Sequence, residues 1–80
     1  MNEIVIKQKL NAIFEDVFDS PGLELRADMT AADVPGWDSL THINLILAVE
    51  REFSIRCTAA EIRELENVGA LMSLVAKKAK

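Results

Sequence analysis

The stretch GWDSL, residues 36–40, joins a long irregular segment to an apolar segment that few polar residues interrupt. Gly36 allows the chain to turn, and Asp38 and Ser39 are both residue types that favour the position just before a helix. We therefore expect a helix that starts at Asp38 or Ser39 and runs to about Glu52. The Ser39 hydroxyl then lies in the first turn, where free backbone N–H groups and the helix dipole favour a bound anion.

This expected helix carries apolar residues at helical spacing. We expect its buried face to consist of Ile43, Ile46, Val49 and Phe53. Leu40 and Leu47 extend the apolar coverage, and because one helix cannot bury every side, these two are the better candidates for contact with a partner. With so few polar residues, the helix is predicted to be the central one of the fold.

The segment before it predicts one helix followed by a long loop. Residues 2–18 have an apolar stripe with helical spacing that comprises Ile6, Leu10, Ile13, Phe14, Val17 and Phe18. Pro21 and Gly22 then stop the helix. Residues 19–37 favour turns, with one short helical turn expected near Thr30 to Val34, and a loop this long in a small domain is often functional.

The segment after it predicts two further helices. Thr58 and Glu61 have the spacing of a capping box, which indicates a short third helix. Asn67 is expected to cap a fourth helix with Val68, Leu71, Met72 and Val75 at helical spacing. No segment alternates with period two for long enough to suggest a sheet. We predict an all-α, mostly antiparallel four-helix bundle with a short third helix and a long first loop, and residues 1–80 as a single domain.

Composition narrows the classes of function. The formal charge of −4 argues against nucleic acid as a partner, because a polyanion requires a basic face. The basic cluster at residues 77–80 is interpreted as a charged helix end. A lone Cys57 cannot form an internal disulfide, which favours a reducing compartment. Neither a signal-peptide layout nor an apolar run of roughly 18 residues is present, so we expect a soluble cytoplasmic protein without stable membrane insertion.

Taken together, these features resemble the family of acyl carrier proteins and peptidyl carrier domains. The hallmark of that family is Asp-Ser-Leu at the opening of the second of four helices, here residues 38–40. The match continues through Ile43, Leu45, Ala48, Val49, Glu50, Phe53, Ser54, Ile55, Asn67 and Val68. The resemblance covers nearly the whole chain, including helix count, loop length and total size.

The resemblance implies a carrier without catalytic activity of its own. Ser39 would receive 4′-phosphopantetheine from coenzyme A through a separate phosphopantetheinyl transferase, and the arm's thiol would hold cargo as a thioester. Asp38 would position the serine and assist the Mg²⁺ of the transferase. The other partners would be an acyl-loading ligase or acyltransferase and downstream acyl-processing enzymes, which bind a monomeric carrier. The candidate contact residues for partners are Trp37, Leu40, Leu47 and Arg51.

The sequence also departs from the pattern of carriers in fatty acid biosynthesis. Thr41 and Asn44 occupy places that are usually acidic there, and Arg51 interrupts a helix end that is typically acidic. We therefore expect a dedicated carrier for a specialised lipid, polyketide or cell-envelope pathway, because steering toward basic enzymes would be weaker. The alternatives are an aminoacyl or peptidyl carrier and an unmodified helical interaction domain with the same fold.

Several residues have a structural interpretation beside the functional one. Ser39 alone is compatible with a simple N-cap, Asp38 with capping, metal assistance or both, and Trp37 with packing or partner contact. His42 is three residues from Ser39, but neighbours on one helical turn supply neither the oriented base nor the oxyanion pocket of a triad. We expect His42 to be an exposed helix residue that touches the arm or the transferase. A further hypothesis places an acyl chain between the second and third helices, lined by Ile55, Ala59 and Leu65.

Overall fold

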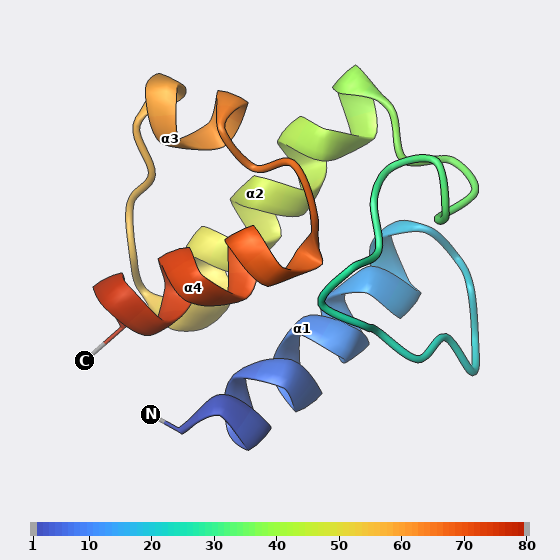
Figure 1. The fold of residues 1–80 in the computed structure, drawn as a ribbon, viewed down its shortest axis with the longest axis horizontal. Coiled ribbons are helices and arrows are strands. Elements are labelled where there is room, and N and C mark those ends of the chain that lie inside the picture. Colours follow the sequence, from blue (N-terminus) through green and yellow to red (C-terminus); the bar gives the residue numbers. More distant parts are fainter. Residues whose placement is uncertain (1, 80) are drawn as a thin grey trace.

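The computed structural model describes residues 2–79, and within this range it contains four helices and no strand. These are α1 (Glu3–Val17), α2 (Ser39–Phe53), α3 (Ala59–Arg63) and α4 (Val68–Lys78). In Figure 1, α1 runs in one direction and α2 and α4 run back, while the short α3 lies beside the upper part of the bundle. The predicted all-α fold with a short third helix is confirmed. Lys80, part of the predicted basic helix end, lies outside the described residues.

Side-chain caps begin α1, α3 and α4, and the sequence predicts those of α3 and α4. The Asn2 side chain accepts a hydrogen bond from the Val5 N–H at 2.9 Å. Thr58 and Glu61 form a reciprocal capping box at the start of α3. Asn67 caps α4 by accepting from the N–H of its third residue at 2.8 Å. Because these bonds join residues only three positions apart, the local sequence is sufficient to place them.

Helix α1, and not α2, lies at the centre of the packing. It packs directly against both α2 and α4, whereas α2 and α4 contact each other much less. Ile6, Leu10 and Phe14 of α1 are almost completely buried between them. The prediction of α2 as the central helix is therefore wrong, because one side of α2 is exposed to solvent.

The buried face of α2 also differs from the prediction at one position. Leu45, Ile46, Val49 and Phe53 are buried. Ile43, which the sequence placed on this face, is 56% exposed. At 100° per residue, Ile43 lies about 120° around the helix from Val49, whereas Leu45 lies about 40° away. Ile43 is nevertheless three residues from the buried Ile46, and Leu45 is four residues from Val49. Each therefore has a helical spacing to a buried residue, and the position of α1 decides which of the two side chains is buried.

The long loop between α1 and α2 is part of the core. Its residues Leu25, Met29 and Val34 are buried. Where a short helical turn was expected, the structure has a single turn closed by the Asp33 N–H and the Thr30 carbonyl at 2.9 Å, and no helix. The loop is therefore held by side-chain burial more than by regular structure.

The same loop also closes the start of α4. The Val68 N–H donates to the Met29 carbonyl at 2.9 Å, and the Gly69 N–H donates to the Ala27 carbonyl at 2.8 Å. These bonds satisfy N–H groups that have no partner inside the helix. Glycine suits this close approach, because a Cβ at position 69 would lie 3.0 Å from the Ala27 oxygen, which is tighter than an ordinary contact. These contacts attach the loop, which leads directly into α2, to the start of α4.

Candidate functional site

The start of α2 is held by a capping box that involves Asp38 and Thr41. Gly36 has a φ of +89°, which turns the chain into the helix. The Asp38 carboxylate accepts from the N–H groups of Leu40 and Thr41, each at 3.0 Å. The Thr41 hydroxyl accepts from the Asp38 N–H at 2.8 Å and donates to the Gly36 carbonyl at 2.6 Å. Thr41, which in the sequence is only a departure from an acidic pattern, thus completes the cap.

This cap also keeps the Asp38 carboxylate ionised. The pKa of Asp38 lies below its ordinary value, because the Thr41 N–H and then the Thr41 hydroxyl stabilise the charged form, with a smaller contribution from the Leu40 N–H. The side chain is exposed. A negative charge is therefore present at the residue just before Ser39.

Ser39 is the first residue of α2 and is exposed. Because Asp38 is the N-cap, the interpretation of Ser39 as a capping residue does not apply in this structure. Within residues 2–79 no hydrogen bond involves the Ser39 hydroxyl. The oxygen is therefore accessible and free for chemistry at the positive end of a helix of 15 residues.

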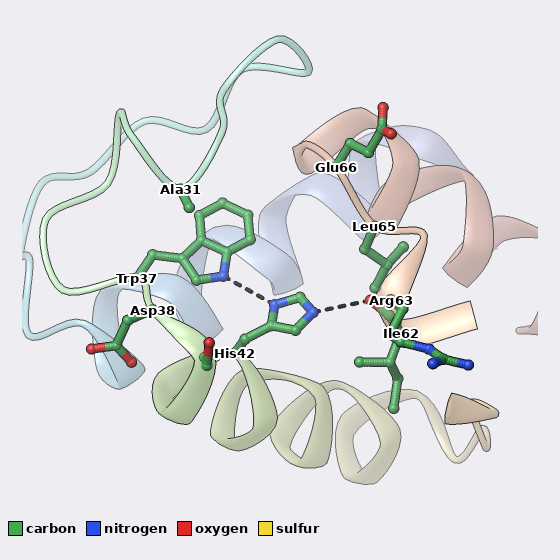
Figure 2. A pocket seen from close by; sticks show the side chains of 9 residues that line it. Ala31, Trp37, Asp38, His42, Ile62, Arg63, Leu65 and Glu66 are labelled. Carbon is green, nitrogen blue, oxygen red and sulfur yellow. Dashed lines mark hydrogen bonds between the residues drawn. The ribbon is translucent and has the colours of Figure 1, made fainter. Parts of the chain in front are cut away.

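An open groove of about 350 Å³ lies beside Ser39. Trp37 and His42 form one side of it, and Ile62 and Leu65 line the other. Figure 2 shows the imidazole of His42 between the indole of Trp37 and the residues of α3. The groove thus brings together the loop before α2, the first turns of α2, and α3.

His42 connects these elements through both ring nitrogens. The Trp37 Nε1–H donates to His42 Nδ1 at 3.0 Å, and His42 Nε2 lies 3.2 Å from the Ile62 carbonyl oxygen (Figure 2). The side chain is half-buried, so the prediction that His42 is an exposed helix residue is wrong. Sequence spacing shows that His42 and Trp37 are near each other, but it contains no signal for Ile62, twenty residues further on.

Trp37 is buried, with 8% of its surface exposed. Its ring packs edge-on against Phe14 of α1 at a centroid distance of 5.4 Å and an interplanar angle of 86°. An edge-to-face pair of this kind is a favourable packing geometry. These contacts favour the packing interpretation of Trp37 over the predicted partner contact.

The remaining predicted partner residues lie on the exposed side of α2. Leu40 is 72% exposed and Leu47 is 55% exposed, and Arg51 is exposed near the end of the helix. Ile43 joins them, so Leu40, Ile43 and Leu47 form what we call the apolar face of α2. The sequence identified two of its three members, because Ile43 was assigned to the core. Contiguous exposed apolar side chains are typical of an interaction surface.

The three predicted liners of an acyl channel do not line a common cavity. Leu65 lines the groove beside Ser39. Ile55 is buried and lines a different groove, beside Leu47 and Arg51. Ala59 is exposed at the start of α3. In this structure, therefore, these residues do not form an internal channel.

Cys57 does not line the groove beside Ser39. It is half-buried, and its N–H donates to the Glu50 carboxylate at 2.8 Å. Burial, followed by the negative charge of Glu50, raises the pKa of the Cys57 thiol. The thiol therefore stays protonated and weakly nucleophilic.

A four-helix fold with an accessible serine at the start of its second helix defines a class of carrier proteins. Consistent with this, the chain is 41% identical to the holo acyl carrier protein from Geobacter metallireducens, whose solution structure superposes with a TM-score of 0.83. The match covers 89% of this chain and 82% of that one. The chain belongs to the acyl carrier protein family, and its role is that of a non-enzymatic acyl carrier.

Other comparisons add no relative. No protein-family model matches the chain, and the search of curated proteins finds no match. Among the described residues, no helix is both long enough and apolar enough to cross a membrane.

Proposed function

We propose that Ser39 is the attachment point of a 4′-phosphopantetheine arm, and that residues 1–80 form one acyl carrier domain that holds acyl groups as thioesters on the arm. A phosphopantetheinyl transferase would supply the arm from coenzyme A. The Ser39 oxygen would form a bond to the phosphorus that carries pantetheine, while the bond from that phosphorus to adenosine 3′,5′-bisphosphate breaks. The hydroxyl proton would pass to solvent.

One observation carries this proposal: the Ser39 hydroxyl is exposed and takes no part in capping its own helix. A serine at the start of a helix usually binds a backbone N–H, which would hold its oxygen against the chain. Here the carboxylate of Asp38 does this instead. The serine oxygen is thus available where a phosphodiester is favoured by the helix dipole.

Asp38 is proposed to have a second task during attachment. Its carboxylate is ionised and exposed one residue before Ser39. Carboxylate oxygens are suitable ligands for Mg²⁺, which commonly bridges a protein and a phosphate group. Asp38 would therefore cap α2 and assist the Mg²⁺ of the transferase.

We further propose that the transferase and the acyl-loading ligase or acyltransferase bind the apolar face of α2, with Arg51 at its end. Three exposed apolar side chains in a row support this surface. Thr41 and Asn44 make it poor in negative charge, which supports a specialised lipid, polyketide or cell-envelope pathway over general fatty acid synthesis. Location in the cytoplasm stays a prediction.

Intact-mass measurement tests the attachment. The purified protein is incubated with coenzyme A, Mg²⁺ and a broad-specificity phosphopantetheinyl transferase. We expect a gain of one phosphopantetheine in the wild type and in Ser73→Ala, which alters an exposed serine of α4, and no gain in Ser39→Ala. An unmodified wild type, with a second carrier modified in the same tube, would instead support an unmodified interaction domain.

A further inference from the structure

We propose that His42 is a positioning residue: it holds α3 across the groove beside Ser39 and thereby keeps cargo in the groove and out of the core. This inference rests on attachment of the arm at Ser39. The hydrogen bonds from Trp37 through His42 to Ile62 span the groove between its two sides. A chain that enters between α2 and α3 from Ser39 must break this bridge.

The chemistry of the three groups determines the state of the imidazole. The indole N–H of Trp37 can only donate, so His42 Nδ1 must accept and carries no proton. In a neutral imidazole the proton is then on Nε2, and this N–H points to the Ile62 carbonyl, which can only accept. Both bonds are satisfied by one tautomer alone. A protonated imidazole would place a second N–H against the indole N–H and break the bond to Trp37.

The position of α3 depends on this bridge because the helix has few other attachments. It has five residues, and none of them is fully buried. Ile62 packs partly against the core, and Glu61 forms an ion pair with Lys78 of α4 at 2.9 Å. Between α2 and α3, the bond from His42 to Ile62 is the only hydrogen bond within residues 2–79. A helix this short has little stability of its own, so loss of the bond would loosen α3.

The groove itself suits cargo that tolerates polar surroundings. Arg63 of α3 and Glu66 of the following segment line it, together with Asp38 from the start of α2. The loop contributes Ala31 and Trp37, which carry no charge. With the bridge intact, short or polar acyl groups would rest in the groove, and a long aliphatic chain would not be taken into the core.

The first measurement concerns the tautomer and needs no arm. In ¹⁵N NMR spectra of the unmodified protein near neutral pH, we expect His42 to have a proton on Nε2 and none on Nδ1. A proton on Nδ1 at neutral pH would overturn the proposal.

The second measurement follows the cargo. The transferase loads the octanoyl-phosphopantetheine arm from octanoyl-coenzyme A onto the wild type, His42→Leu and His42→Gln. The amide of glutamine has an acceptor and a donor, as the imidazole does, and so can restore the bridge. In the wild type and His42→Gln, we expect loading to shift the NMR signals of groove residues and to leave those of the core unchanged. In His42→Leu, we expect the methyl signals of the buried Leu45, Ile46 and Leu71 to shift as well.

The outcomes separate this inference from the proposed function. Octanoyl loading that shifts the core methyl signals in the wild type would overturn the role of His42, although attachment at Ser39 would stand. Absence of any mass gain would contradict attachment at Ser39. The tautomer measurement would then test by itself whether the hydrogen bonds from Trp37 through His42 to Ile62 form. If His42→Leu does not fold, the wild-type tautomer and the wild-type methyl signals still decide the matter.

Discussion

At the scale of single residues, Asp38 and Ser39 divide two tasks between them. The Asp38 carboxylate accepts hydrogen bonds from the free N–H groups of the first turn, and Ser39 remains exposed. Thr41 makes the division possible, because its hydroxyl binds the Asp38 backbone and the Gly36 carbonyl. A short run of polar residues thus presents one oxygen to solvent at a rigid position.

A prediction about pH follows from the lowered pKa of Asp38. A carboxyl whose pKa is lower in the folded state stabilises the fold above its unfolded pKa, and this contribution is lost as the pH falls through the folded value. The ordinary value is 3.8. We expect the difference in unfolding free energy between the wild type and Asp38→Asn, measured in urea, to be constant near neutral pH and to shrink below 3.8.

A pH-independent difference for Asp38→Asn would contradict the prediction. The same variant separates the two tasks of Asp38, because the amide oxygen can still cap α2 but is a weaker ligand for Mg²⁺. We expect slower modification of Ser39 in Asp38→Asn at a temperature where the variant is folded.

At the scale of elements, α2 has two apolar sides with different tasks. One side is buried against α1, and the other presents Leu40, Ile43 and Leu47 to solvent. The exposed side contributes little to stability, because its side chains stay in water in the folded state. It begins next to Ser39, so an enzyme bound to it would have the arm within reach.

A double variant tests this surface. Leu40→Gln with Leu47→Gln should lower kcat/KM of the transferase for the carrier by about tenfold or more, since truncating a central contact of an interface commonly costs over 1 kcal/mol. The melting temperature should barely change, because exposed substitutions usually alter stability by less than about 0.5 kcal/mol. Ile4→Gln, at a residue of α1 that is 70% exposed, is the control and should leave kcat/KM unchanged. Equal loss in both variants would refute a specific surface on α2.

At the scale of the whole molecule, the long loop acts as a structural part and not as a mere connection. Asn11 of α1 accepts from the Leu25 N–H at 2.9 Å, and Leu25 is 1% exposed. Further along, Met29 and Trp37 are buried, and the loop backbone binds the start of α4. The loop therefore links α1, α2 and α4, and it positions the residues that precede Ser39.

Shortening a buried side chain of the loop should consequently destabilise the entire fold. Leu25→Ala removes a buried side chain and should lower the free energy of unfolding by about 2–5 kcal/mol. This is a large part of the total for a small domain, which is about 5–15 kcal/mol. Leu40→Ala makes the same chemical change at an exposed site and should cost less than about 0.5 kcal/mol. Urea unfolding followed by circular dichroism measures both, and equal effects would show that the loop is not part of the core.

Local patterns in the sequence determined the four helices, three of their caps and the position of Ser39 at the start of α2, because each depends on residues within one or two turns. Tertiary structure decided which side of α2 is buried, since a helix that is apolar almost all round has no unique face until α1 packs on it. It also decided the role of His42, because the carbonyl of Ile62 comes within hydrogen-bond distance only when α3 folds back beside α2. Contacts between residues distant in the chain depend on the packing of whole helices, and no short stretch of sequence contains that information.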